Sequence, residues 1–186
     1  MFATAYIQAV SEPDLAAIVD EIQRRAEAPV DAREAASAHR ILAELPRLER
    51  PFDEHADPVH ITGSAVVVGL RGVILHKHRK LGIWVQPGGH VDPGETPAEA
   101  AAREASEETG LPVELADEAL IHVDVHPGPN GHTHLDLRYL CTAPDRDPAP
   151  PPEESQEVLW LGWDDAIARA DDGLRGLLLA RRPSHT

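Results

Sequence analysis

The segment 89-GHVDPGETPAEAAAREASEETGL-111 is a loop that leads into a well-marked helix. Thr96 and Glu99 form a capping box, and Pro97 at the first helical position favours a helix start. Gly110 follows the last turn, where a left-handed residue commonly ends a helix. These signals predict a helix over residues 97–109, and the alanines on one of its faces allow it to lie close against a sheet.

Three glutamates share another face of this predicted helix. Glu104, Glu107 and Glu108 stand at i, i+3 and i+4, so their carboxylates gather on one surface. Each like-charged pair costs roughly 0.2–0.5 kcal/mol, and the C-terminal end of a helix disfavours negative charge. Hard oxygen ligands at one point suit Mg²⁺ or Mn²⁺. A solvated acidic face is the alternative, and the glutamates alone leave the two interpretations close to even.

The loop before the helix decides between them, because the whole segment resembles the signature of the Nudix hydrolases. That signature is Gly-x5-Glu-x7-Arg-Glu-U-x-Glu-Glu-x-Gly-U, where U is apolar. It is matched here at Gly89, Glu95, Arg103, Glu104, Ala105, Glu107, Glu108, Gly110 and Leu111. Ala105 is small where bulkier aliphatic residues are usual. The resemblance extends to residues 84–89 before the segment and to residues 157–164 near the end of the chain.

The resemblance implies a metal site and a hydrolytic enzyme. Glu104 and Glu108 would be the principal metal-ligating carboxylates, and the Gly89 carbonyl would complete the inner site. Glu107 would be a further ligand or a base that acts on water. The expected cofactor is Mg²⁺, with Mn²⁺ as a substitute, since such an ion neutralises phosphate oxygens and activates water.

Two further catalytic roles follow from the resemblance. Arg103 would pair with Glu95 and hold the loop against the helix, which is a positioning role. The general base in this family is often a glutamate on a late loop, and the candidates here are Glu153, Glu154 and Glu157. Solvated loop acids are the preferred interpretation for the first two, so Glu157 is the expected base.

The remaining sequence predicts two helices followed by a mixed α/β domain. Ser11 and Asp31 can cap helices within residues 11–50, and Pro46 ends or kinks the second. Strands are expected at residues 65–70 and 73–78, joined by Arg71-Gly72, and at residues 120–126, 132–142 and 157–161. A short apolar stretch lies at residues 81–85, and closing helices are expected from Asp164 and Gly173. We therefore expect an α/β/α sandwich with a mixed β-sheet over residues 59–186, preceded by a two-helix extension over residues 1–58.

Histidines and aspartates alternate with apolar residues along two predicted strands. One polar row is His122, Asp124 and His126, and the other is His132, His134 and Asp136. A short turn joins the strands, so antiparallel pairing would set the rows side by side. A solvent-facing surface, a substrate pocket and an additional metal site are all open. The pocket is preferred for the row as a whole, with His126, His132 and His134 as substrate-binding residues.

The charge balance limits the partners of the protein. Seventeen basic residues oppose 32 acidic residues, for a formal net charge of −15. Such a chain repels nucleic-acid backbones and anionic membranes, so neither is an expected partner. No stretch approaches the ~18–20 apolar residues of a membrane span. The N-terminal residues lack a secretory pattern, and the single cysteine fits a reducing cytoplasm. We therefore expect a cytoplasmic protein.

The expected reaction is hydrolysis of a phosphoanhydride bond in a small nucleotide-like molecule. The first substrate class is a nucleoside diphosphate linked to another moiety, such as ADP-ribose or a nucleotide sugar. One alternative is a nucleoside triphosphate pyrophosphohydrolase with a housecleaning role. A non-catalytic nucleotide-binding regulatory module is the alternative of another class. A homodimer is also an expectation, with the N-terminal helices as the surface that would serve it.

Overall fold

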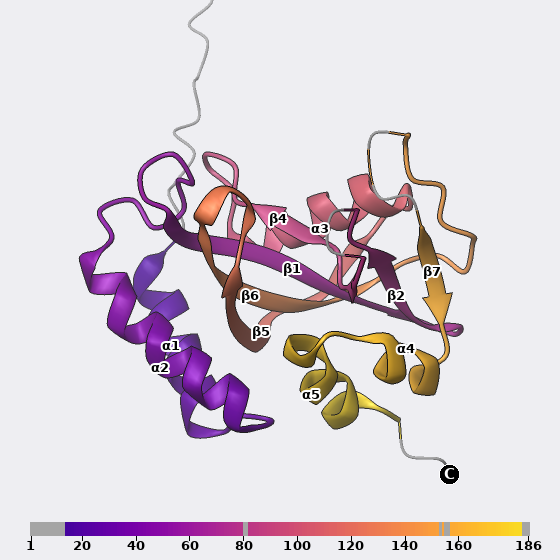
Figure 1. Ribbon diagram of the computed structural model, residues 1–186, viewed down its shortest axis with the longest axis horizontal. Helices are drawn as coiled ribbons and strands as arrows, with labels where there is room; N and C mark the ends of the chain where they lie inside the picture. The colour runs from indigo at the N-terminus through magenta and orange to yellow at the C-terminus, as the bar shows by residue number, and fades with distance from the viewer. Residues whose placement is uncertain (1–13, 80–81, 153, 155–156, 184–186) are drawn as a thin grey trace, which may run out of the picture.

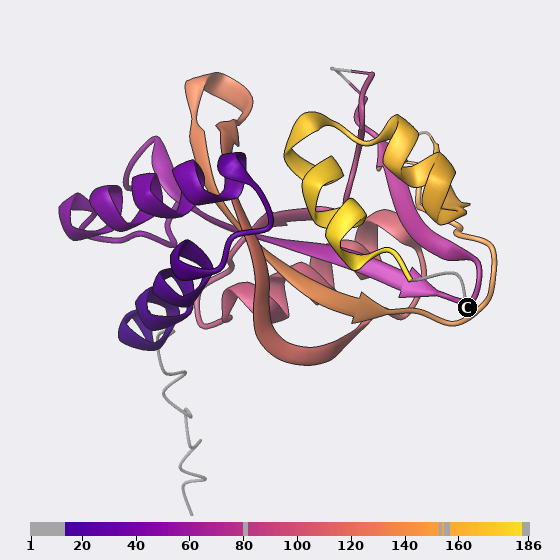
Figure 2. The same ribbon diagram turned by 90° about the horizontal axis from the view of Figure 1, so that it is seen from below.

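The computed structural model describes residues 14–79, 82–152, 154 and 157–183, and these residues form a mixed sheet between helices. Helix α3 (Pro97–Thr109) lies on one face of the sheet. Helices α4 (Trp163–Arg169) and α5 (Asp172–Arg181) lie on the other, as Figures 1 and 2 show. The predicted α/β/α sandwich is confirmed. None of the helices in the described part of the chain has the length and apolar character needed to cross a membrane.

Seven strands form the sheet within the described residues. Their bounds are β1 Val59–Gly69, β2 Gly72–Lys77, β3 Trp84–Val85, β4 Gly88–His90, β5 Glu114–Pro127, β6 Thr133–Thr142 and β7 Val158–Leu161. The main order is β3-β2-β1-β6-β5, while β4 pairs with β1 and β7 pairs with β2. Only the β1–β6 pair is parallel among the ladders described. The predicted hairpin is present, with Gly69 opposite Gly72.

Helix α3 has the predicted bounds because its local signals agree with one another. The Thr96 hydroxyl accepts from the Glu99 N–H at 3.2 Å, and the Glu99 carboxylate accepts from the Thr96 N–H at 2.8 Å. Gly110 ends the helix in the left-handed conformation, with φ of 68°. The helix lies very close to β1, since a Cβ on Gly63 would stand 2.1 Å from the Pro97 carbonyl oxygen.

Two helices precede the sheet, and the N-cap of the first differs from the prediction. Helix α1 (Leu15–Glu27) is capped by Asp14, whose carboxylate accepts from two N–H groups of the first turn at 3.0 and 3.2 Å. Ser11 lies outside the described residues. Asp31 caps helix α2 (Ala32–Glu44) as predicted, and Pro46 lies in the 3₁₀ turn η1 (Leu45–Arg47) that follows it.

Helix α2 covers strand β5 at the edge of the sheet. The Ser37 hydroxyl accepts from the Val125 N–H at 3.1 Å, so an edge-strand donor is satisfied by a helix side chain. Apolar residues of both N-terminal helices enter the main core, including Ile18, Ile22 and Ile41. The two helices therefore pack on the sheet of their own chain, as Figure 1 shows.

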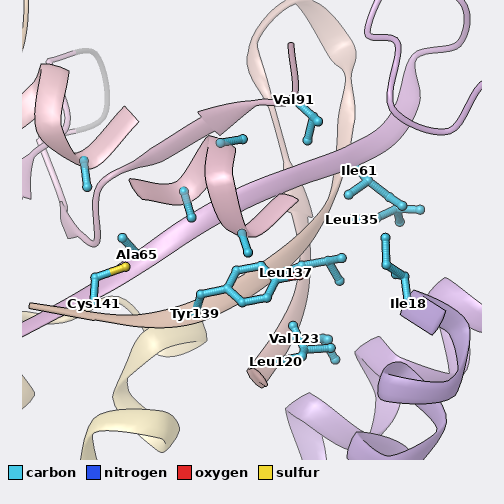
Figure 3. Packing of buried hydrophobic residues seen from close by; sticks show 14 of the residues in the cluster. Ile18, Ile61, Ala65, Val91, Leu120, Val123, Leu135, Leu137, Tyr139 and Cys141 are labelled. Atoms are coloured by element: carbon cyan, nitrogen blue, oxygen red, sulfur yellow. The ribbon is translucent and has the colours of Figure 1, made fainter. Parts of the chain in front are cut away.

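The main core lies on the α3 face of the sheet. Figure 3 shows Leu135, Leu137 and Tyr139 of β6 pointing to this face beside Ile18 of α1. A second apolar cluster fills the opposite face beneath α4 and α5, and it contains Leu174, Leu177 and Leu178. Burial of this apolar area is the dominant favourable term in folding. On the face opposite α3, strands β1, β5 and β6 carry buried polar residues.

Candidate active site

The carboxylates of α3 lie against the glycine turn at β4. Gly89 faces the helix so closely that a Cβ there would stand 2.5 Å from the Glu104 carboxyl carbon. The Gly88 N–H donates to a Glu108 carboxylate oxygen over 2.9 Å. Glu107 is the most exposed of the three predicted ligands, with a 55% exposed side chain. The fold thus places Gly89 and the three glutamates at one point, between the end of α3 and strand β4.

Arg103 ties the loop to the helix. Its guanidinium donates to both carboxylate oxygens of Glu95, at 2.9 and 3.0 Å, which is a bidentate pair. It also donates to Glu104 at 2.9 Å and to the His90 carbonyl at 3.0 Å. Glu107 receives a longer contact of 3.4 Å. The Arg103 side chain therefore fixes the loop that carries Glu95, the end of β4 and the orientation of Glu104.

The site is short of positive charge in the absence of a cation. Burial raises the pKa of Glu108 to about 8, and the neighbouring Glu104, Glu154 and Glu107 carboxylates add to the shift against the Gly88 hydrogen bond. Burial also raises the pKa of Glu104, although Arg103 opposes that shift. Carboxylates that repel one another in a partly dry site are a donor set that a divalent cation fits.

The proline-rich loop brings a fourth carboxylate to this site. The Ala149 N–H donates to the Thr109 carbonyl at the end of α3 over 2.9 Å. Further along the same loop, Glu154 is near enough for its charge to raise the pKa of both Glu104 and Glu108. The side chain of Glu157, the expected base, lies 3.7 Å from the Lys77 ammonium. Glu153 lies outside the described residues.

A buried ion network occupies the sheet face opposite α3. Arg138 lies between two aspartates, with 2.8 Å to Asp136 and 3.3 Å to Asp124. Ser64 donates to Asp136 at 2.7 Å, and Arg33 of α2 reaches Asp124 through two hydrogen bonds of 2.8 and 3.0 Å. Burial opposes ionisation of both aspartates. The hydrogen bonds and the positive charges outweigh it, so the net pKa of each is lowered.

The two predicted polar rows do lie side by side. In the β5–β6 ladder His122 stands opposite Arg138, Asp124 opposite Asp136, and His126 opposite His134. The His126 Nε2 atom is 3.8 Å from the Asp136 carboxylate, and its ring centroid is 5.3 Å from that of His134. His132 precedes the strand rather than lying in it. The predicted substrate-binding histidines are therefore close together on one sheet face.

Parallel pairing adds histidines that the sequence did not single out. His60 of β1 stands opposite His134 of β6, and His90 at the end of β4 stands opposite Thr62. Burial is the main cause that lowers the pKa of His60 and also lowers that of His134, to about 3. The alternation of His60, Thr62 and Ser64 was a detectable signal of a polar face. The pairing that joins it to β6 was not detectable.

The comparisons with known proteins agree with this fold. The NUDIX domain model matches residues 59–181. The asymmetrical bis(5'-nucleosyl)-tetraphosphatase of Caenorhabditis elegans is 33% identical over 102 residues, which are 53% of this chain and 72% of that protein. An RNA pyrophosphohydrolase of Erythrobacter litoralis is 56% identical over 39 residues, which are 21% of this chain and 24% of that protein. The chain belongs to the Nudix family.

A solved structure shows the same architecture. A NUDIX-family hydrolase from Clostridium perfringens superposes with a TM-score of 0.56 and 27% identity, over 65% of this chain and 92% of that one. The matched segment spans only about a quarter of the Erythrobacter relative, 24% of its length. Family membership and fold are thus established.

Proposed function

We propose that the protein is a magnesium-dependent Nudix hydrolase that cleaves a phosphoanhydride bond in a nucleotide-like substrate. The observation that carries this proposal is the meeting of the Gly88-Gly89 turn with the Glu104 and Glu108 carboxylates, beside an Arg103 already bound to Glu95. The chain has a net charge of −15, so a phosphate substrate needs a bridging cation. Mg²⁺ or Mn²⁺ would supply charge neutralisation and activation of water there.

The roles of the residues follow from their positions. Gly89, Glu104, Glu107 and Glu108 are proposed to hold the cation. The Gly88 N–H fixes one Glu108 oxygen, which leaves the other for the ion. Arg103 acts as a positioning residue, because its hydrogen bonds to Glu95 and to the His90 carbonyl hold the loop against α3. Pre-organised charge of this kind is the main contribution that proteins make to phosphoryl chemistry.

The general base is proposed to be a carboxylate of the late loop. Glu157 was the expectation from the sequence, but its side chain lies near Lys77. Glu154 is better supported, because its charge acts on both Glu104 and Glu108. Turnover of E154Q and E157Q against pH distinguishes them. The variant that lacks the base should lose the lower limb of its pH–rate profile, whereas replacement of a solvated acid should leave the profile unchanged.

The substrate class is a nucleotide joined through its phosphates to a second moiety. ADP-ribose and nucleotide sugars are the first members to test, with His126, His132 and His134 proposed as the polar wall beside the substrate. Dinucleoside polyphosphates are the second candidate, favoured by the similarity to the C. elegans bis(5'-nucleosyl)-tetraphosphatase. Nucleoside triphosphates are the further alternative, and a binding-only module is the alternative outside catalysis.

The test is phosphate release from a substrate panel in a phosphatase-coupled assay. The panel holds ADP-ribose, nucleotide sugars, dinucleoside polyphosphates and ordinary or oxidised triphosphates, each with Mg²⁺ and with an EDTA control. We expect one class to be hydrolysed far faster than the rest and EDTA to abolish that activity. Nucleotide binding without turnover of any panel member would favour the regulatory module instead.

A further inference from the structure

Four histidines from separate segments of the chain converge at one end of the polar sheet face. They are His60 of β1, His90 of β4, and His132 and His134 at the start of β6. One ring nitrogen from each lies within 4.8 Å of those of the other three. The ring centroid of His60 is 5.1, 5.1 and 5.2 Å from those of His90, His132 and His134. His60 is therefore the centre of the cluster.

Strand register explains why these side chains meet. His60 and His134 are direct partners in the parallel β1–β6 ladder, so their side chains leave the sheet on the same face. His90 stands opposite Thr62, two residues along β1 from His60. The turn between β5 and β6 lies beside the start of β1, as Figure 1 shows, and Thr133, the residue after His132, pairs with Val59. The backbone thus holds all four positions before any ligand binds.

The protonation of His60 can be assigned from its backbone contact. Its Nδ1 atom lies 3.1 Å from the Asp57 carbonyl oxygen, which can only accept, so Nδ1 carries the proton. Its Nε2 atom is then a lone-pair donor, and the side chain is fully buried. Histidines that bind metals commonly donate the other ring N–H to a carbonyl in this way.

Three of these rings have a buried nitrogen without a hydrogen bond. The Nε2 atoms of His60, His90 and His134 have no hydrogen-bond partner among the described residues. A Glu54 carboxylate oxygen lies 3.3 Å from the His90 Nε2 atom, without the alignment of a hydrogen bond. Buried polar atoms in native proteins are nearly always paired, so three unpaired ring nitrogens close together indicate a ligand-binding site. Neutral rings keep these lone pairs available, and burial lowers the pKa of both His60 and His134.

We propose that His60, His90, His132 and His134 bind one transition-metal ion of the zinc class. Imidazole nitrogens suit Zn²⁺, whereas the oxygen ligands of α3 suit Mg²⁺ and Mn²⁺, so the two sites select different ions. Tetrahedral zinc with metal–nitrogen bonds of about 2.0–2.1 Å places its ligand atoms about 3.4 Å apart. Small side-chain rotations would bring the four nitrogens to that spacing. Four protein ligands describe a closed, structural site.

The proposed ion would stabilise the neighbouring glutamate site. His90 directly follows Gly89, and the His90 carbonyl accepts from Arg103 over 3.0 Å. An ion on the four rings would cross-link β1, β4 and β6, and would fix the end of β4 from which Gly89 faces Glu104. His132 and His134 would then be metal ligands rather than direct substrate contacts. His126 would remain free for the substrate.

The test uses untagged full-length protein in the E104Q/E108Q background, which removes the glutamate site from the measurement. The protein is stripped with a chelator, loaded with Zn²⁺ or Co²⁺ and desalted. We expect one Zn²⁺ per chain by mass spectrometry, and the intense visible absorption of tetrahedral Co²⁺. A His132→Asn variant, at a half-buried position, should weaken Zn²⁺ binding by about tenfold or more. His60→Asn should do the same with an unchanged circular dichroism spectrum.

The matched control is His39→Asn, on the exposed face of α2, which should bind Zn²⁺ like the parent. A second readout is thermal unfolding, where Zn²⁺ should raise the Tm of the parent and not that of His132→Asn. If His60→Asn fails to fold, His132→Asn decides the matter. A parent that retains no stoichiometric Zn²⁺, or a His132→Asn variant that binds it as tightly as the parent, would overturn the proposal.

Discussion

Gly89 faces Glu104 at a distance that leaves no room for a side chain. A Cβ on Gly89 would stand 2.5 Å from the carboxyl carbon of Glu104 and 2.6 and 2.8 Å from its two oxygens. Gly89 pairs with Gly63 of β1, which itself lies against the start of α3. Two glycines in register thus let the helix that carries the glutamates approach the strand closely.

Replacing Gly89 with alanine should therefore displace the Glu104 carboxylate. We expect at least about a hundredfold loss of kcat, since misplacing a charge-stabilising group costs about that much. Overpacking should also lower the free energy of unfolding by about 1–3 kcal/mol. Enzyme assays and urea unfolding measure both. Gly162→Ala is the control, because a Cβ there meets no neighbour within 4 Å. Equal effects of the two substitutions would refute the close contact.

Arg103→Lys should lower kcat more than it changes KM. Lysine keeps the charge but cannot make the bidentate bond to Glu95 together with the bond to the His90 carbonyl. A fall in kcat of about tenfold or more is expected. Steady-state kinetics separates the effects on kcat and KM, with Arg24→Lys on the surface of α1 as the control. A change confined to KM would instead assign Arg103 to substrate binding.

The metal-free protein should lose stability as the pH rises through the Glu108 titration. Its pKa is raised from 4.5 to about 8, so between these values the folded state keeps a proton that the unfolded chain has released. Stability due to this group therefore falls with increasing pH. Mg²⁺ binds the carboxylate form, so it should release a proton and remove that decline.

Thermal unfolding across this window, with EDTA and with Mg²⁺, provides the measurement. The buried neutral histidines act in the opposite sense, because they resist protonation below their ordinary pKa and so lower stability at acid pH. The difference between the parent and E108Q isolates the glutamate. Identical pH profiles for the two proteins would mean that Glu108 ionises normally.

Removing Arg138 should destabilise the fold strongly. Its side chain is 1% exposed and separates the Asp124 and Asp136 carboxylates. Arg138→Met removes the buried cation that the two aspartates share and leaves Asp124 paired with Arg33, and a loss of about 3–5 kcal/mol is expected from urea unfolding. Arg33→Met is the comparison, since the Arg33 side chain is 43% exposed and Asp124 would keep its contact with Arg138. Unfolding of both variants at the same urea concentration would contradict a central role of Arg138 in this network.

Local sequence signals predicted those parts of the structure that depend on local interactions. The capping box, the first-turn proline and Gly110 act within one helix, and α3 has the predicted bounds. The hairpin at Arg71-Gly72 and the side-by-side polar rows likewise depend on neighbouring segments. The prediction of Ser11 as the N-cap of α1 was wrong, because the Asp14 side chain accepts from the first-turn N–H groups.

Contacts between distant segments were not predictable in this way. Arg33 and Asp124 are 91 residues apart, and their pairing depends on α2 lying against the sheet edge. His60 joins His134 only through the parallel ladder between β1 and β6. Sequence alone does not favour Glu154 as the base, because nothing local indicates the hydrogen bond from Ala149 that holds its loop against the end of α3.

Hydrolysis of the best panel substrate by E104Q/E108Q at saturating Mg²⁺ tests the central claim most directly. Glu27→Gln, at an exposed position of α1, is the control for loss of a surface carboxylate. We predict that E104Q/E108Q loses at least about a hundredfold in kcat while it remains folded, and that Glu27→Gln keeps the parent rate. Turnover by E104Q/E108Q within a few-fold of the parent would contradict the assignment of the α3 glutamates to the catalytic site.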